Sequence, residues 1–381
     1  MKAQEDSATP KRRTLHVIQC LAGNKQLFLD EWEYNLKSVL VNAPLDSNLH
    51  VHIIADATAT HSVKERIATY RLENTSWRNE VSLTLNNVEE HIPIWISHLK
   101  EALTNETTSG KSWIDKRLGI GSYFRLFAHR VILSYEKYEN EITSFEKRDL
   151  EEAVYMDTDV VVIANMNNLM DSTHRVLEKK KEDGFEKPLW IWNQNSGFMV
   201  MDLTRFEHMW ELANMTPSVA NSVQKNKCDQ WILAEVQNVF PNATGMLPNE
   251  WTTTVGHGFR KLPHNLLFTR KDVGMLHFTS RNKGNWFHGN GTDFICQTSK
   301  VCNHLDPSYM GNLDRVRRSW GLAEYYGKMT WDWAFFQVCL FYFNLFSSCI
   351  LLVSLFSFNQ DSHQFLLANY LIRRLFIINH C

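Results

Sequence analysis

Val154-Tyr155-Met156-Asp157-Thr158-Asp159-Val160-Val161-Val162-Ile163 is the stretch around which the sequence is arranged. Its apolar and β-branched residues are typical of a buried strand in a parallel sheet. Two ionised aspartates at the end of such a strand are costly to remove from water unless a cation meets them. Mg²⁺ and Mn²⁺ prefer carboxylate oxygens and commonly bridge them to substrate phosphates. We interpret the stretch as an Asp-x-Asp metal site for a phosphorylated donor, with a strand that ends in a polar turn as the alternative.

The composition is that of an ordinary globular protein. The chain has 381 residues, 44% hydrophobic and 22% charged, so it could hold one large domain or two smaller ones. The formal net charge of −2 gives no indication of a nucleic-acid-binding surface. The seven cysteines include no Cys-x-x-Cys pair. Cys296 and Cys302 are the one pair considered for a disulfide, with free thiols as the alternative.

The first part of the chain alternates strand and helix patterns. A short apolar strand ending at Cys20 precedes a helix with Phe28 and Trp32 on its apolar face, and a second strand runs from Leu49 to Asp56. Strand, helix and strand at this spacing predict a βαβ unit, whose ligands bind beyond the carboxyl ends of the strands. The turn after Cys20 and the region near Asp56 are therefore expected on the ligand side. Asp56 is equally interpreted as a helix cap.

Later segments place polar residues beside apolar ones. A helix is expected from Leu118 to Leu133. Its Arg125 either pairs with an anion or keeps its charged end at the surface over a buried stem. Asn195, in a polar turn before a strand, could hydrogen-bond hydroxyls, and Gly197 suits the close approach of the backbone to a ligand. Asp229 is interpreted as the N-cap of an amphipathic helix.

The C-terminal part differs from the rest. Residues 334–358 contain no charged side chain and are long enough to cross a membrane once, which needs about 20 residues. A buried or interfacial helix is the alternative, and the segment around Arg373-Arg374 is typical of an interfacial amphipathic tail. We therefore expect a polar tail at 1–13, a catalytic domain at 14–325 and a hydrophobic tail at 326–381.

Taken together, six segments resemble, in order, the motifs of the family 8 glycosyltransferases. The resemblance covers roughly residues 14 to 290 and rests on the order of the motifs more than on any one of them. It implies an α/β GT-A fold, which is a Rossmann-like mixed sheet flanked by helices, and a retaining enzyme that uses a UDP-sugar and usually Mn²⁺. The segments are Tyr123-Phe124-Arg125-Leu126, Tyr155-Met156-Asp157-Thr158-Asp159, Asn195-Ser196-Gly197-Phe198-Met199-Val200-Met201-Asp202-Leu203, Asp229-Gln230, Leu247-Pro248-Asn249-Glu250-Trp251, and His277-Phe278 with Lys283 and Trp286.

The resemblance also implies a role for each matching residue. Asp157, Asp159 and His277 would hold Mn²⁺ or Mg²⁺ and leave positions open for phosphate oxygens. Arg125 would make a forked contact with the diphosphate or the sugar hydroxyls. The metal and Lys283 would neutralise the departing UDP. Residues expected at the donor are Cys20, Ala22, Arg125, Asp157, Thr158, Asn195, Gly197 and Lys283, and those expected to act in catalysis are Asp229, Gln230 and Lys283.

The sequence departs from the family pattern mainly near the last motif. Ser280 and Gly284 stand where the family has Gly and Pro, and Trp286 lies one position late. Trp231 and Ala234 replace the Asp and Asn that follow Asp-Gln, and Thr252 replaces an Asn. The pattern is nearer to the divergent eukaryotic members, including the xylosyltransferases, so a hexose or a xylose is the expected sugar and a hydroxyl group of a glycan or another molecule is the expected acceptor.

Two rival functions remain. A haloacid-dehalogenase-type phosphatase also uses an Asp-x-Asp-x-Val motif, but it normally places that motif on its first strand. A catalytically silent sugar-nucleotide-binding protein on the same fold is the second rival. A Golgi or other secretory-pathway membrane, reached through the C-terminal tail, is the expected location, with the cytoplasm as the alternative.

Overall fold

The computed structural model describes most of the chain up to residue 278. The described residues are 13–44, 47–69, 81–94, 96–97, 120–138, 150–182, 187–219, 228–252, 254–255 and 274–278. All of them belong to the first of the two units into which the chain divides, Met1–Ala334. The expectations for Lys283, Trp286, the Cys296–Cys302 pair and segment 334–358 lie outside these residues. Within the described ranges, no helix combines the length and apolar character needed to cross a membrane.

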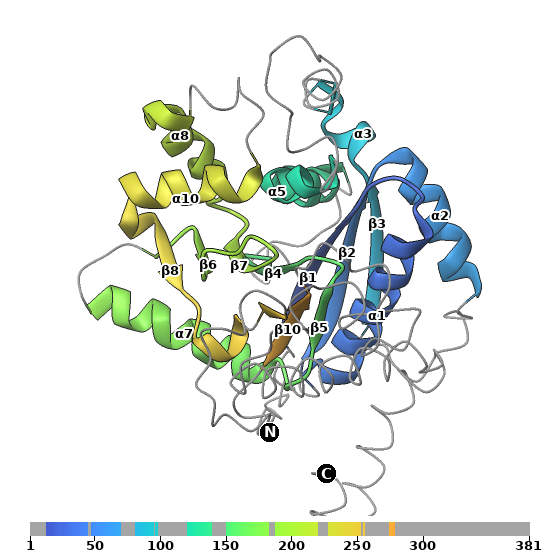
Figure 1. Ribbon diagram of the computed structural model, residues 1–381, viewed down its shortest axis with the longest axis horizontal. Coiled ribbons are helices and arrows are strands. Elements are labelled where there is room, and N and C mark those ends of the chain that lie inside the picture. Colours follow the sequence, from blue (N-terminus) through green and yellow to red (C-terminus); the bar gives the residue numbers. More distant parts are fainter. Residues whose placement is uncertain are drawn as a thin grey trace, which may run out of the picture. The chain divides into compact units, whose positions relative to one another are not determined.

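A seven-stranded mixed sheet forms the centre of the described part (Figure 1). Its first four strands in space are parallel, and β7 runs antiparallel to both of its neighbours. Such a mixed sheet flanked by helices is the architecture that the GT-A resemblance implies. In spatial order the strands are β3 (Val81–Asn87), β2 (Asn48–Ala55), β1 (Thr14–Leu21), β4 (Glu152–Met156), β7 (Phe198–Asp202), β6 (Trp190–Trp192) and β8 (Thr244–Met246).

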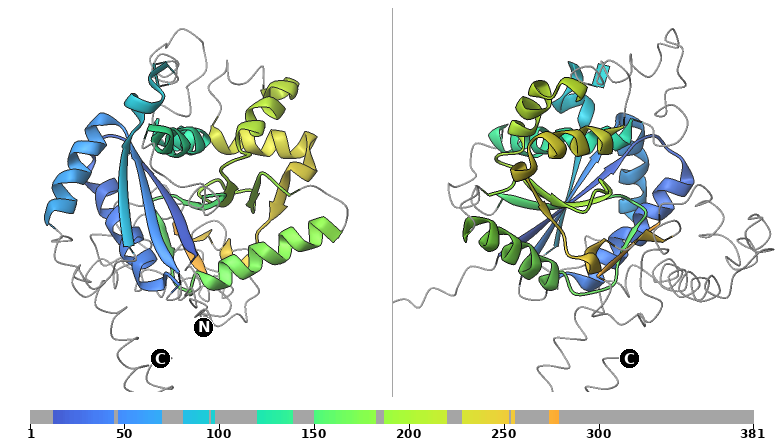
Figure 2. Two further views of the ribbon diagram at one scale, coloured as in Figure 1. Left: turned by 180° about the vertical axis from the view of Figure 1, so that it is seen from behind. Right: turned by 60° about the vertical axis from the view of Figure 1, so that its left-hand side comes forward.

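Helices cover both faces of the parallel half of this sheet, as the two views of Figure 2 show. α1 and α2 lie on one side of β1–β3, and α5 lies on the other side, where it packs on β1 and β2. The β1–α1–β2 unit has the expected strand, helix and strand order, and α1 ends at Asn42 before Ala43-Pro44. The helices are α1 (Gln26–Asn42), α2 (Ala57–Thr69), α3 (Val88–His91), α5 (Gly121–Tyr138), α7 (Asn167–Glu182), α8 (Glu207–Met215) and α10 (Asp229–Val239), with short 3-10 turns η2 (Pro241–Ala243) and η3 (Asn249–Trp251).

Alternation along β1 separates the two faces, because successive side chains of a strand point to opposite sides. Ile18 and Cys20 join the apolar core under α5, together with Phe124. Gln19 points the other way and accepts a hydrogen bond from Trp32 Nε1 of α1 at 2.9 Å. Burial of both apolar faces explains why β1 is buried along nearly its whole length.

The Asp-x-Asp stretch is not one strand. β4 ends at Met156, residues 157–159 turn, and β5 (Val160–Val162) belongs to a second, three-stranded sheet with β10 (Met275–Phe278) and β9 (Thr254–Val255). The turn is closed by a hydrogen bond from Val160 N to Asp157 O at 3.1 Å. The aspartates were expected at the end of a strand, and β4 ends immediately before them. The polar Asp-Thr-Asp segment supplies a turn, which lets the apolar residues on its two sides enter different sheets.

The face of α1 that meets β5 is polar although it is buried. Ser38 Oγ accepts a hydrogen bond from Val162 N at 3.0 Å, and Asn42 Nδ2 donates one to Val162 O at 3.0 Å. These side chains satisfy backbone groups of β5 that would otherwise be buried without partners. α1 therefore fixes the strand that leads out of the Asp-x-Asp turn.

Candidate functional site

Three potential metal ligands meet where the two sheets adjoin. Asp157 follows β4, Asp159 precedes β5, and His277 lies on β10 beside Val160. One ligand atom from each lies within 4.8 Å of the others. His277 Nε2 is 3.2 Å from Asp159 Oδ1 and 3.8 Å from Asp157 Oδ2. Residues separated by about 120 positions are thus brought together by the pairing of β5 with β10.

The backbone at Gly197 makes room for this cluster. A Cβ at this position would lie 2.1 Å from His277 Cε1 and 2.6 Å from Asp157 Oδ2, far inside the closest real contacts. The sequence had indicated a glycine that lets the backbone approach a ligand. In the structure Gly197 lets the β6–β7 turn approach the side chains of the cluster, and Asp157 N donates to Gly197 O at 2.7 Å.

The residues present fit a divalent cation. Two carboxylates and an imidazole form a mixed oxygen and nitrogen donor set that suits Mn²⁺ or another first-row metal. Asp159 and His277 are buried and Asp157 is half-buried, so the cluster has one side toward the surface. Two carboxylates held this close would repel each other without a positive charge between them. The cluster is therefore compatible with a bound divalent metal.

Arg125 connects this cluster with α10. Its guanidinium lies 2.8 Å from Asp157 Oδ1 through Nη2 and 3.1 Å from Asp229 Oδ2 through Nε. It also donates to the carbonyl oxygens of Ser122, at 2.8 Å, and Ser196. The side chain is 4% exposed, so the expectation of a surface charge over a buried stem was wrong, and pairing with an anion was the better interpretation. The two aspartates share one fixed guanidinium, which holds them in register with the β6–β7 turn.

Asp229 is not the N-cap of its helix. The cap position belongs to Cys228, without a side-chain cap hydrogen bond, and Asp229 is the first residue of α10. Its buried carboxylate faces Arg125 and is hydrogen-bonded by Ser196. Burial raises the pKa of Asp229, and the Arg125 guanidinium opposes that rise. The Asp229 carboxylate therefore pairs with Arg125 and does not cap the backbone of α10.

Tyr155 closes the other side of Asp157. Its hydroxyl donates to Asp157 Oδ1 at 2.5 Å, and the Arg125 guanidinium lies 4.6 Å from the centre of its ring. Burial raises the pKa of the Tyr155 hydroxyl well above its ordinary value, so the group remains a hydrogen-bond donor. The sequence quoted this residue only as part of a motif. Its position two residues before Asp157 on the same side of the chain was the available signal.

The backbone of the Asp-Thr-Asp turn is held from α1. Asn35 Nδ2 donates to Val160 O at 2.7 Å and to Asp157 O at 3.2 Å, and Asn35 Oδ1 accepts from Gln19 Nε2. Gln19 is in turn held by Trp32. Sequence reasoning did not assign these residues a role, although a glutamine inside the apolar strand Leu15–Leu21 is the kind of buried polar residue that must have a partner.

A pocket opens beside the cluster, at the carboxyl ends of β1 and β4. Five of the residues expected at the donor line it, and the acidic Glu31 and the apolar Phe28 of α1 line it as well. Asp56 holds the turn that follows β1, because its Oδ2 accepts a hydrogen bond from Gly23 N at 2.9 Å. Its Oδ1 accepts from Ala59 N at 2.7 Å and so caps α2. The five expected residues in the lining are Cys20, Ala22, Arg125, Asp157 and Thr158.

The remaining expected residues lie around this pocket or outside the described part. Asn195 is half-buried in the β6–β7 turn, and its side chain accepts from Gly197 N at 2.9 Å. Gln230 is exposed on the first turn of α10. Lys283 lies outside the described residues. The phosphatase family normally places its Asp-x-Asp motif on the first strand, whereas here the motif follows β4, the fourth described strand along the chain.

No protein-family model and no curated protein sequence matches the chain. Solved glycosyltransferases are among the structures similar to it. The glycosyltransferase GlyE of Streptococcus pneumoniae TIGR4 is 12% identical over 85% of this chain with a TM-score of 0.45, and this chain spans 62% of the length of GlyE. The galactosyltransferase LgtC, solved with donor and acceptor sugar analogs, is 13% identical over 78% of this chain and 100% of LgtC, with a TM-score of 0.43. Mouse xyloside xylosyltransferase 1 is 11% identical over 70% of this chain and 98% of its own, with a TM-score of 0.39.

Proposed function

We propose that this protein is a retaining glycosyltransferase that moves a hexose or a xylose from a UDP-sugar to a hydroxyl acceptor, assisted by a divalent metal. The observation that carries the proposal is the convergence of Asp157, Asp159 and His277 within 4.8 Å beside a pocket at the carboxyl ends of β1 and β4. Ligands of open α/β sheets bind at this edge. The order of the sequence motifs supports the same reaction.

The charge of the site suits a metal-bound diphosphate. Asp157 and Asp229 share the guanidinium of Arg125, so among the described residues the site has more carboxylates than cations. A dication offsets that excess and also attracts phosphate oxygens. Asp157 and Asp159 belong to the cluster and also line the pocket, so a diphosphate in the pocket would reach the same cation.

In the proposed reaction the chain positions the donor and the chemistry occurs at the sugar. Cys20, Ala22 and Thr158 line the space for the nucleotide, and Arg125 keeps Asp157 and Asp229 in place. Asn195, Asp229 and Gln230 orient the sugar, and Lys283 meets the charge of the departing UDP. A cation held by Asp157, Asp159 and His277 supplies electrostatic stabilisation of the same charge.

Retention of configuration requires attack from the face that UDP leaves. Gln230 is a poor nucleophile, so we favour direct attack by the acceptor hydroxyl on that face. The bond from the anomeric carbon to the UDP oxygen breaks as the bond to the acceptor oxygen forms, and a phosphate oxygen of UDP takes the acceptor's proton. Asp229 then acts by orientation and charge, and Asp229→Asn is expected to lower turnover while donor binding is kept.

The test is release of UDP by the full chain from a panel of UDP-glucose, UDP-galactose and UDP-xylose, with Mn²⁺ and with chelator. We expect metal-dependent release from one donor and a loss of at least about 100-fold in Asp159→Ala, because a metal ligand is removed. Asp171→Ala, an exposed aspartate on α7, is the matched control and should retain activity.

The other outcomes separate the rival functions. If UDP bound but no UDP-sugar released UDP, with or without an acceptor, a silent sugar-nucleotide-binding protein would be favoured. Phosphate release from a phosphomonoester, abolished by Asp157→Asn, would favour the phosphatase. If the protein neither bound UDP nor turned over a UDP-sugar or a phosphomonoester, the proposal would be overturned.

A further inference from the structure

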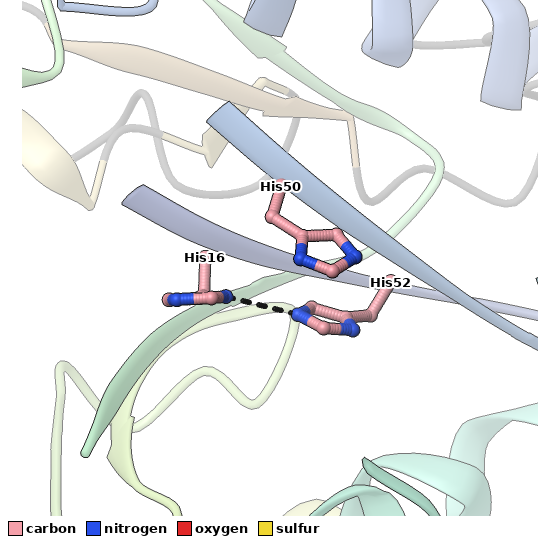
Figure 3. A group of neighbouring side chains, drawn as sticks. All are labelled: His16, His50 and His52. Carbon is pink, nitrogen blue, oxygen red and sulfur yellow. Dashed lines mark hydrogen bonds between the residues drawn. The ribbon is translucent and has the colours of Figure 1, made fainter. Parts of the chain in front are cut away.

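Three histidines form a second cluster away from the candidate active site (Figure 3). His16 lies near the start of β1, and His50 and His52 lie on β2. The parallel register pairs His16 with His50. Residues two apart on a strand share a face, so all three side chains point to the same side of the sheet. They lie toward the amino ends of these strands, whereas the Asp-x-Asp pocket is at the carboxyl ends.

The ring nitrogens of the three histidines converge. One nitrogen from each lies within 4.8 Å of the others. His16 Nδ1 and His52 Nε2 face each other at 3.0 Å, as the dashed line in Figure 3 shows. The His50 and His52 rings are stacked with centres 4.0 Å apart, and the His16 and His52 centres are 5.3 Å apart.

We propose that His16, His50 and His52 bind a transition-metal cation of the class that prefers imidazole, with Zn²⁺ as its representative. This site is separate from the Asp157–Asp159–His277 cluster. Imidazole suits zinc, copper and nickel, whereas a carboxylate-rich site suits magnesium and manganese. Three histidines with an open fourth position are an established zinc donor set.

The surroundings of the rings distinguish this site from ordinary core packing. The next residues on the same face of the strands, Ile18 and Ile54, are apolar and join the core under α5. Three neighbouring positions of this face carry imidazoles instead: His16 beside His50, and His52 two residues further along β2. The other ring nitrogen of His16, Nε2, is buried and has no hydrogen-bond partner among the described residues. Polar rings that only filled space would cost free energy that aliphatic residues avoid.

The His16 and His52 ring nitrogens have nearly the spacing of two zinc ligands. Zinc–nitrogen bonds of about 2.0–2.1 Å in a tetrahedral site put two ligand nitrogens about 3.3 Å apart. The His16–His52 pair, at 3.0 Å, is within a few tenths of an ångström of that spacing. His50 Nε2 is bonded to Thr84 Oγ1 at 2.6 Å, which leaves its Nδ1 for the ion and fixes the ring as an outer hydrogen bond does in metal sites.

The protonation state and the access route agree with a metal site. His16 and His52 are both 4% exposed, and burial disfavours the charged form of an imidazole, so the surroundings suit neutral, ligating rings. His50 is half-buried, and His16 also lines a cavity with Glu152 and His174, through which an ion could enter. Arg13 at this cavity is engaged by Glu152 at 3.4 Å.

The experiment measures Zn²⁺ and Co²⁺ binding to the full chain after metal removal. Asp159→Ala removes the carboxylate-rich site and is the background for all measurements. In this background we expect one equivalent of Zn²⁺ bound, a rise in Tm with Zn²⁺, and visible d–d absorption bands when Co²⁺ is used. His50→Gln and His52→Gln should each lower Zn²⁺ affinity by at least tenfold and weaken the Co²⁺ bands. His129→Gln, a buried histidine of α5 that is bonded to Glu207, is the matched control and should leave both unchanged.

Either of two results would overturn the proposal. One is the absence of stoichiometric Zn²⁺ binding in Asp159→Ala, and the other is unchanged binding in His50→Gln. His50 is half-buried and its replacement keeps a polar side chain beside Thr84, so this variant decides the question even if His52→Gln does not fold.

Discussion

Gly197 leaves no room for a side chain beside the candidate metal ligands. Gly197→Ala would place a methyl group 2.1 Å from His277 Cε1 and 2.6 Å from Asp157 Oδ2. We expect Mn²⁺ affinity to fall by about 10–100-fold, the range found when the setting of a metal ligand is disturbed, while the sheet still folds. Titration of Mn²⁺ by electron paramagnetic resonance measures the affinity.

A second glycine provides the control. Gly245 lies on β8, away from the cluster, and the Cβ of Gly245→Ala would lie 3.0 Å from Val176 Cγ1. This variant should lower Tm and leave Mn²⁺ affinity unchanged. If Gly197→Ala bound Mn²⁺ as tightly as the unaltered protein, the proposed ligand set would be wrong.

Arg125 is the second residue whose replacement gives a sharp expectation. Arg125→Met leaves Asp157 and Asp229 without their shared guanidinium and leaves the Ser196 carbonyl without its donor. Breaking a buried ion pair from one side costs about 3–5 kcal/mol, so urea unfolding should show a loss of that size.

Arg130→Met is the matched control on the same helix. The Arg130 side chain is 27% exposed, and it pairs with the Glu207 side chain, which is 49% exposed. Surface pairs contribute about 0–1 kcal/mol, so the control should lose no more than that. A loss below about 1 kcal/mol in Arg125→Met would contradict the role given to this side chain.

The sequence predicted the identity of the cluster better than the setting of its members. Asp157, Asp159 and His277 were named from motifs, and the structure brings their ligand atoms together. The buried pairing of Asp229 with Arg125 was not predicted, because an aspartate at a helix start matches the local preference for an N-cap. Only the tertiary position of α5 shows that a guanidinium faces it.

Among the elements, α1 has the most direct influence on the site. Asn35→Ala removes the donor to Val160 O and Asp157 O and leaves Gln19 without its acceptor. We expect a loss of about 1–3 kcal/mol in stability, since buried groups become unsatisfied. Mn²⁺ affinity should also fall, because the Asp-Thr-Asp turn loses its support. Urea unfolding and Mn²⁺ titration on one sample measure the two effects.

Asn42→Ala separates the two effects. Asn42 lies on the same buried face of α1 and donates to Ser38 O and Val162 O, farther along the chain from the turn. It should lose a similar amount of stability and keep its Mn²⁺ affinity. Equal changes in affinity for both variants would mean that α1 acts through general stability rather than through the turn.

The contact between α5 and α8 predicts part of the acid sensitivity. Hydrogen bonding by Arg130, and then by His129, lowers the pKa of Glu207 from 4.5 to about 2. A carboxylate with a lowered pKa in the fold contributes stability above its unfolded pKa, and this contribution is lost as the pH falls from about 4.5 toward 2. Glu207→Gln should therefore lower stability at pH 6 and reduce the further loss between pH 4.5 and 3.

Urea midpoints at pH 6, 4.5 and 3 measure this dependence. Glu211→Gln is the control, since Glu211 is one turn further along α8 and pairs with the exposed His208 at 2.8 Å. The same slope in Glu207→Gln and in the unaltered protein would show that the α5–α8 contact does not contribute to acid unfolding.

The elements were predictable where hydrophobic periodicity alone determines them. The β1–α1–β2 unit and the strand at Met275–Phe278 agree with their patterns. The division of the Asp-x-Asp stretch between β4 and β5 was not predictable, because apolar residues on both sides of the turn fit one strand or two equally well. The pairing of β5 with β10 joins residues far apart in the chain and leaves no local signal.

In the described unit as a whole, the candidate metal site joins the two sheets, because its ligands come from segments of both. Asp157 follows β4 of the large sheet, Asp159 precedes β5 of the small sheet, and His277 lies on β10 of the small sheet. Two hydrogen-bonded amides of the small sheet adjoin the candidate ligands: Val160 N donates to Asp157 O at 3.1 Å, and Phe278 N donates to Asp159 O at 3.0 Å. A cation that binds only the folded arrangement stabilises it by mass action.

We therefore expect Mn²⁺ to protect the small sheet more than the large one against local opening. With free Mn²⁺ at 100 times its Kd, the linkage corresponds to about 2.7 kcal/mol, so the amides of Val160 and Phe278 should exchange up to about 100-fold more slowly than with chelator. The amides of Val17 and Ile53, in the core of β1 and β2, should change little. Asp159→Ala should show fast exchange in the small sheet under both conditions. If chelator left the exchange of Val160 and Phe278 unchanged in the unaltered protein, the small sheet would hold its place without a metal, and the cluster would have to act in donor binding alone.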